Sequence, residues 1–190
     1  MKIARTLLLL ATSFFAFTGS ADARCDITAS RAWAVGRKLP YSMEASSVGS
    51  ECKRSVVLIV VRDGKGEVKY SFSGPARDNA IFSGLADTPV ANTKNMRVAL
   101  GEWLDAGLSS KKNKLSQYLE WKPGTEGPAE TPPAEFPFTV NSEVSRETYE
   151  EWRKQSLPVF CFVQGIESMR CLVLTKDGTI GDVGVQSFPG

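Results

Sequence analysis

The chain of 190 residues contains no histidine. Histidine is the commonest general base, a frequent metal ligand and the usual pH switch near neutrality, so its absence excludes Ser-His-Asp and Cys-His catalysis. The sequence also lacks the G-x-S-x-G elbow, the G-x-x-x-x-G-K-[ST] phosphate loop and the dinucleotide G-x-G-x-x-G fingerprint. We therefore expect no cofactor and no metal, and we favour a protein that is not an enzyme.

The sequence has a single long apolar run, over residues 6–17, and it lies behind two basic residues near the N-terminus. A membrane-spanning helix needs about 20 apolar residues, and this run has about a dozen. That length, followed by an Ala-x-Ala site at 21–23, is typical of a cleavable secretory signal. We predict that residues 1–23 are a signal peptide and that the mature protein is periplasmic or secreted, without a stable membrane anchor. A membrane anchor or a buried helix is the alternative.

The net charge of the chain is close to zero. Without residues 1–23 the chain keeps 21 basic and 20 acidic residues. Such a balance gives no electrostatic capture of nucleic acid or of an anionic membrane, so we expect no nucleic-acid partner. The densest basic cluster, Lys-Lys-Asn-Lys at 111–114, is interpreted as a solvated helix end, with a phosphate site as the alternative.

All four cysteines lie beyond the predicted signal. An even number of cysteines in an exported protein favours two disulfides. The sequence contains no C-x-x-C pair, which is the spacing typical of a redox centre. Cys161 and Cys171 are equidistant from Ile166 in a predicted hairpin and should face each other across it. This register favours a bond between them, and it leaves Cys25 to pair with Cys52. The other two pairings remain open.

Hydrophobic periodicity predicts an α+β fold: an antiparallel sheet of about five or six strands with one or two helices packed on one face. The clearest signal is the apolar run 56–61, followed by a turn rich in glycine and by alternating apolar residues to Phe72, which predicts a hairpin. Further expected elements are strands over 27–35, 138–140, 159–164, 169–175 and 180–188, helices over about 93–107 and 145–155, and a loop over 39–52.

We expect one α+β domain over residues 24–190, with a Pro-rich connection at about 122–137. That connection holds five prolines and two glycines, and it can form neither a helix nor an inner strand. A Pro-rich binding ligand is the alternative interpretation. Residues 58–64 also resemble residues 172–178, which indicates either a duplicated hairpin or the shared chemistry of Asp-Gly turns.

The sequence contains only weak matches to known catalytic motifs. Ser50 and Lys53 match S-x-x-K, but the companion motifs are missing, so we attribute the match to chance. Glu44, Asp87 and Glu167 are available as carboxylates for a histidine-independent hydrolase, which would need two acids about 5–10 Å apart in a cleft.

The leading functional hypothesis is an exported, non-catalytic binding or inhibitory module of the cell envelope, with an envelope or extracellular protein as its partner. Its expected contact point is the hairpin tip formed by Gly165, Ile166, Glu167 and Ser168, which a disulfide between Cys161 and Cys171 would tether. The alternatives are a carrier of a small apolar ligand and the histidine-independent envelope hydrolase. Tyr41, Tyr118 and Trp121 are further contact candidates, although each is more typical of ordinary packing.

Overall fold

The structure is a computed structural model that describes residues 24–33, 40–84, 90–108, 113–128 and 137–188; the predicted signal peptide and part of the Pro-rich connection lie outside these ranges. The first half of the chain forms β1 (Ile27–Trp33), β2 (Tyr41–Val48), the 3-10 turn η1 (Cys52–Arg54), β3 (Val56–Arg62), β4 (Val68–Pro75), η2 (Ala76–Asp78), α1 (Ala80–Ser83) and α2 (Thr93–Leu108). The second half forms η3 (Leu115–Gln117), β5 (Phe138–Val140), α3 (Arg146–Lys154), β6 (Val159–Val163), β7 (Ser168–Leu174) and β8 (Ile180–Ser187).

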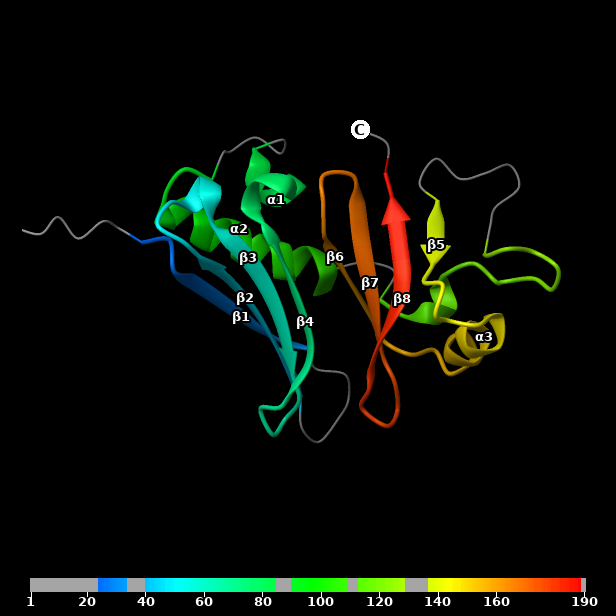
Figure 1. The fold of residues 1–190 in the computed structure, drawn as a ribbon. Helices are drawn as coiled ribbons and strands as arrows, with labels where there is room; N and C mark the ends of the chain where they lie inside the picture. Colours follow the sequence, from blue (N-terminus) through cyan, green and yellow to red (C-terminus); the bar gives the residue numbers. More distant parts are fainter. Residues whose placement is uncertain (1–23, 34–39, 85–89, 109–112, 129–136, 189–190) are drawn as a thin grey trace, which may run out of the picture.

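The strands form two antiparallel sheets of four, which confirms the predicted α+β class (Figure 1). The first sheet has the order β1-β2-β3-β4, and the second has the order β5-β8-β7-β6. They are separate sheets and not one sheet of five or six strands. The reason lies in the connection: after β4 the chain enters η2, α1 and α2, so the later strands pair with one another through their own hairpins.

The predicted loop over 39–52 is wrong, because β2 fills most of it and pairs with β1 on one side and β3 on the other. Its side chains alternate: Tyr41, Met43 and Ala45 are buried, and Ser42, Glu44 and Ser46 face the opposite side. Serine and alanine masked this period of two in the sequence, since neither contrasts strongly with its neighbours.

Helix α2 covers the inner face of the first sheet. It forms over the predicted range of about 93–107 and buries an apolar stripe at helical spacing: Met96, Ala99, Leu100, Trp103 and Leu104. Arg31 of β1 donates two hydrogen bonds to the carboxylate of Asp105, at 2.7 and 2.8 Å. The far end of the helix meets β6 so closely that a Cβ atom on Gly107 would lie 2.3 Å from the carbonyl oxygen of Cys161. A glycine is therefore required at this contact between the helix and the second sheet.

Aromatic side chains fill the space where the two sheets meet. Phe162 of β6 packs against four rings, with centroid separations of 5.1 to 6.3 Å; these rings belong to Tyr70, Phe72, Trp103 and Phe160. Offset and edge-to-face pairs of this kind add stability beyond the area they bury. The first sheet, α2 and one face of the second sheet thus share one hydrophobic core.

The opposite face of the second sheet has its own core. Helix α3 lays Tyr149 on it, and Tyr118, from the segment after η3, joins Val159 and Val173 there. Ser145 caps α3 by accepting a hydrogen bond from the backbone N–H of Thr148 at 3.2 Å. Because both faces are covered, four of the five residues of β6 are buried.

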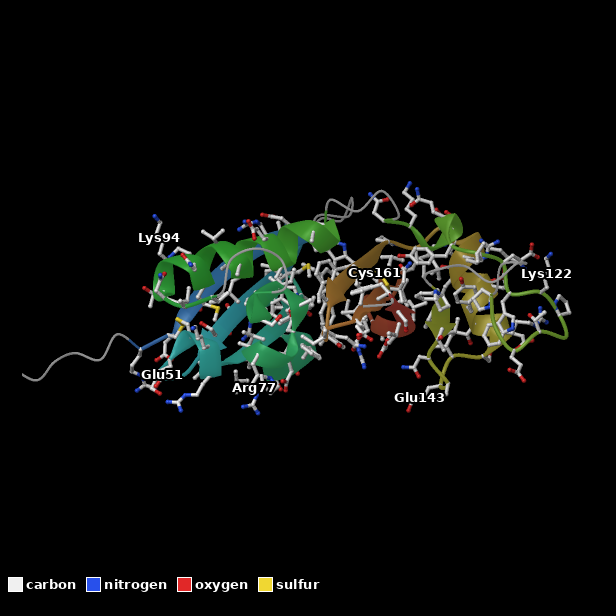
Figure 2. All side chains as sticks on the ribbon, turned by 90° about the horizontal axis from the view of Figure 1, so that it is seen from above. Glu51, Arg77, Lys94, Lys122, Glu143 and Cys161 are labelled. Carbon is white, nitrogen blue, oxygen red and sulfur yellow. A yellow bond between two sulfur atoms is a disulfide. The ribbon has the colours of Figure 1, made fainter. Side chains whose placement is uncertain are left out.

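Both predicted disulfides are present. Cys161 and Cys171 are direct partners across β6 and β7, with their Cα atoms 4.0 Å apart. Cys25 and Cys52 join the start of β1 to η1, with a Cα separation of 5.1 Å. Figure 2 shows Cys161 near the middle of the molecule, between α2 and α3. Each half of the fold is therefore closed by one disulfide.

Candidate functional site

The tip between β6 and β7 is the contact site expected from the sequence, and its side chains are unequally exposed. Ile166 and Glu167 are exposed, while Gly165 and Ser168 are half-buried. Ile166 has 37% of its surface in water, the lowest value among the six large apolar residues of the described ranges that are exposed. The tip thus presents an apolar side chain beside a carboxylate.

Neighbouring elements hold the base of this tip from one side. The side-chain amide of Asn79 and the indole N–H of Trp103 both donate to the carbonyl oxygen of Val163, each at 2.7 Å. The backbone N–H of Ala80, at the start of α1, donates to the carbonyl oxygen of Gly165 at 3.1 Å. Asn79 is itself buried. The last residues of β6 are therefore fixed to α1 and α2.

Further bonds hold the tip from its own hairpin and from the end of β8. Gln164 donates through its amide to the hydroxyl of Ser168 at 3.2 Å and accepts from Arg170 at 2.6 Å. The backbone N–H of Phe188 donates to the carbonyl oxygen of Glu167 at 3.0 Å. With its backbone restrained on both sides, the tip has little backbone conformational entropy left to lose.

A polar cluster lies beneath the tip, between the two sheets. Arg170 donates to one oxygen of Asp182 at 2.6 Å, and the other oxygen is buried and has no hydrogen-bond partner among the described residues. Burial raises the pKa of nearby Tyr70; Arg170 opposes this rise and Asp182 adds to it. Arg170 thus joins the cluster to Gln164 and to the tip.

The outer face of the first sheet is a second exposed surface. Three apolar residues of β3, Val56, Leu58 and Val60, lie along its centre, and Val48 of β2 pairs with Val56. Serines of β2 and β4 flank this strip, for example Ser46 and Ser73 beside Leu58. No described element packs on this face, and its apolar strip is partly open to water.

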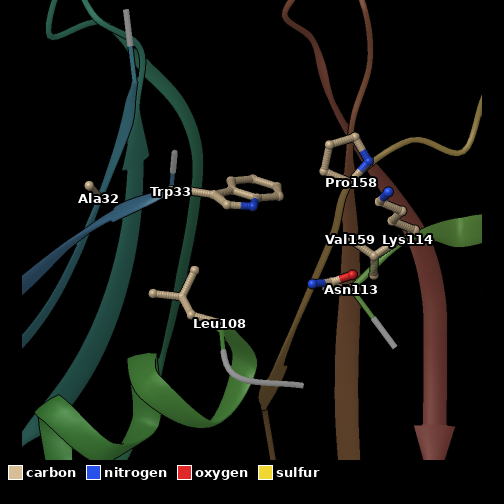
Figure 3. A pocket seen from close by; sticks show the side chains of 7 residues that line it. All are labelled: Ala32, Trp33, Leu108, Asn113, Lys114, Pro158 and Val159. Carbon is tan, nitrogen blue, oxygen red and sulfur yellow. The ribbon is translucent and has the colours of Figure 1, made fainter. Parts of the chain in front are cut away.

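Two pockets lined by described residues are similar in size. One, of about 290 Å3, lies between the sheets and is lined by Ala32, Trp33, Leu108, Asn113, Lys114, Pro158 and Val159 (Figure 3). The other, of about 280 Å3, lies at the start of α2 and is lined by Ser50, Glu51, Cys52, Lys53, Ala91, Asn92 and Thr93. Neither lining contains two carboxylates.

The candidate acids do not come together. Glu44 lies on the outer face of the first sheet, Glu167 lies at the tip of the second, and Asp87 falls outside the described residues. The described part of the chain holds no group of three or more Asp, Glu or Cys residues placed to bind a metal ion. Ser50 and Lys53 border the pocket at α2, but Cys52 between them is bonded to Cys25.

The three aromatic contact candidates belong mainly to the interior. Tyr41 is buried and donates to the carbonyl oxygen of Gly178 at 2.8 Å. Tyr118 places its hydroxyl 3.1 Å from the Sγ of Cys161, and burial raises its pKa to about 12. Trp121 is half-buried and donates to the carbonyl oxygen of Thr125. Ordinary packing accounts for them.

No protein family, curated protein or solved structure matches the chain. Among the helices in the described ranges, none is long and apolar enough to cross a bilayer.

No pattern in the sequence indicated the pocket between the sheets or the cluster around Arg170. Both are assembled from strands far apart in the chain, and the residue types involved also occur on ordinary surfaces. Pairing of the hairpin was the only information that could have located Arg170, since it lies next to Cys171 on β7.

Proposed function

We propose that the chain is an exported, non-catalytic binding module that recognises a protein of the cell envelope or exterior through the tip between β6 and β7. The observation that carries the proposal is the restrained tip: hydrogen bonds from α1, α2, the hairpin and β8 fix its backbone, while Ile166 and Glu167 stay exposed. A pre-organised loop with an apolar anchor is a common way to bind a protein at low entropic cost.

Export is supported by the two disulfides and by the N-terminal apolar run in the sequence. Mass spectrometry of the mature protein should find Arg24 as its first residue, and thiol titration of the unreduced protein should find no free sulfhydryl. Four free thiols, or an intact residue 1–23 segment, would reject the periplasmic or secreted location.

The binding proposal is tested by immobilising the mature protein and measuring what it retains from an envelope extract of its own cells. Ile166→Asp should reduce retention of a stoichiometric protein partner more than tenfold. Val98→Asp is the matched control, because Val98 is also exposed, at 54%, but lies on α2. Circular dichroism and thermal unfolding verify that both variants fold.

Two outcomes would contradict the proposal. Equal loss in both variants indicates non-specific apolar adhesion. Loss on Val56→Asp, with Ile166→Asp unchanged, would move the binding surface to the outer face of the first sheet. A smaller loss, of a few fold, is expected for Glu167→Gln, since an exposed charge at an interface rim contributes more to association rate than to affinity.

A further inference from the structure

The pocket between the two sheets has one wall from the first half of the fold and one from the second. Figure 3 shows the Trp33 indole projecting from the end of β1 toward Asn113, Val159 and Pro158, with Leu108 of α2 below it. This site lies away from the tip proposed above to bind a protein, so its occupant is a separate question.

The wall opposite Trp33 is held in place by backbone pairing. The N–H of Val159 donates to the carbonyl oxygen of Asn113 at 2.8 Å, and the N–H of Leu115 donates to that of Leu157 at 2.9 Å. Lys114 and Pro158 form an isolated antiparallel bridge between these bonds. The segment 113–115 therefore extends the edge of the second sheet beside β6 and fixes where Asn113 and Lys114 stand.

The apolar part of the pocket is also fixed. Trp33 is 5% exposed and packs against Phe160, with ring centroids 5.9 Å apart, and against Tyr41 at 6.5 Å. Leu108 and Pro158 are half-buried, whereas the side chain of Val159 belongs to the core on the other face of the second sheet. A volume of about 290 Å3 lies at the small end of pockets that hold organic ligands, and it suits one aromatic ring with a short chain.

The polar groups of the pocket are all able to donate hydrogen bonds. Lys114 is exposed and forms no ion pair within the described ranges, and no described residue accepts from the Trp33 indole N–H. Asn113 adds a side-chain amide, and the described lining contains no acidic residue. An ammonium group and a neutral donor, with no carboxylate opposing them, are complementary to an anion.

We propose that this pocket binds a small organic anion with a flat apolar body, of the arylalkanoate class. The aromatic ring lies between Trp33 and Leu108 on one side and Pro158 on the other, and the carboxylate meets the Lys114 ammonium and the Asn113 amide. This site differs from the predicted carrier of an apolar ligand, because the pocket is open to solvent and one side of it is charged. It also gives a role to Lys114 of the basic cluster; the other lysines of that cluster, at 111 and 112, lie outside the described residues.

The test titrates the mature protein with 3-phenylpropanoate and follows the indole N–H resonances of its four tryptophans by NMR. The resonance assigned to Trp33, by its loss in Trp33→Phe, should shift with saturation at concentrations up to about 10 mM, the range set by one ring and one ion pair. Lys114→Gln should weaken binding about five- to tenfold. Lys53→Gln is the control, because Lys53 lines the other described pocket.

The neutral analogue 3-phenylpropanol separates the anion site from a merely apolar hollow, and acetate separates it from a bare charge. The proposal expects both to bind at least fivefold more weakly than 3-phenylpropanoate. It is overturned if no saturable shift of Trp33 occurs, if the alcohol binds as well as the acid, or if Lys114→Gln and Lys53→Gln behave alike. Because the readout is on Trp33, failure here leaves the role proposed for Ile166 unaffected.

Discussion

The two sheets each have four antiparallel strands, but they are covered differently. The second sheet has α2 and the first sheet against one face and α3 against the other, so β6 and the C-terminal part of β7 are buried on both sides. Within the described ranges, elements cover the first sheet on its inner face alone, and β3 alternates between buried and partly exposed residues. Apolar residues in the second sheet are therefore accounted for by packing, whereas those on the outer face of the first sheet are not.

The largest expected effects test this difference directly. In β7, the side chains of Leu172 and Val173 are fully buried in opposite cores. Replacing either one with alanine should lower the free energy of unfolding by about 2–4 kcal/mol. In β3, Ile59→Ala should cost a similar amount, but Val60→Ala should cost less than about 1 kcal/mol. Urea unfolding measures all four variants. A loss of more than about 2 kcal/mol for Val60→Ala would mean that the outer face is covered in solution.

Removing each disulfide in turn compares the stability of the two halves on a similar energy scale. The Cys25–Cys52 bond spans 27 residues and Cys161–Cys171 spans 10, so chain entropy predicts losses of about 3.5 and about 2.7 kcal/mol for the paired alanine variants. Thermal unfolding under non-reducing conditions gives the values. If the second loss greatly exceeds the first, packing of the hairpin bond against Tyr118 outweighs loop entropy.

Alkaline unfolding probes the second core through Tyr118. Burial raises its pKa to about 12, from about 10 in an unfolded chain, so the folded protein keeps this proton longer. The contribution of Tyr118 to the free energy of unfolding is therefore fully present below pH about 10. It falls as the pH rises to about 12, by up to about 2.7 kcal/mol. Burial also raises the pKa of Tyr149, so part of the alkaline loss remains after Tyr118→Phe.

The measurement is urea unfolding of the wild type and Tyr118→Phe at several pH values from neutral to strongly alkaline. The variant should lose less stability than the wild type across the alkaline range. Parallel curves would show that Tyr118 ionises normally and that the second core admits water. Ultraviolet absorbance of ionised tyrosine provides an independent titration of the same group.

The sequence was sufficient for features that rest on local pattern. Apolar runs and turns located the hairpins, the stripe from Met96 to Leu104 located α2, and equal spacing about Ile166 located the disulfide partners Cys161 and Cys171. It was insufficient for β2, whose serines conceal the alternation, and for the division into two sheets, which depends on which strands pair after α2.

The candidate site was partly predictable for the same reason. The position and exposure of the tip follow from the hairpin, but its restraints do not. Asn79, Trp103 and Phe188 all bind the tip from segments at least 20 residues away in the chain. Nothing in their local sequence indicates these hydrogen-bond partners. Trp33 and Lys114 likewise share a pocket only because the two sheets meet.

The smallest expected effects concern the turns that connect β3 to β4 and β7 to β8. The resemblance between residues 58–64 and residues 172–178, here called the echo, aligns Gly64 with Gly178 in the sequence. In the structure, however, Gly66 is the residue that has the conformation of Gly178. Both have positive φ, at 85° and 94°, and each donates its N–H to the residue three positions earlier, at 2.9 and 3.1 Å. Similar turn chemistry, two residues out of register with the echo, favours chance over duplication.

Alanine at these glycines makes the comparison quantitative. Gly66→Ala and Gly178→Ala should each cost about 1 kcal/mol, because a side chain disfavours the left-handed region even where, as at Gly66, no atom lies within 4 Å of the new Cβ. Gly64→Ala should change stability by less than about 0.5 kcal/mol, since its φ is not positive. Urea unfolding resolves the three values. Equal costs at Gly64 and Gly178 would restore the alignment that the echo suggests, and with it the case that the two hairpins share an origin.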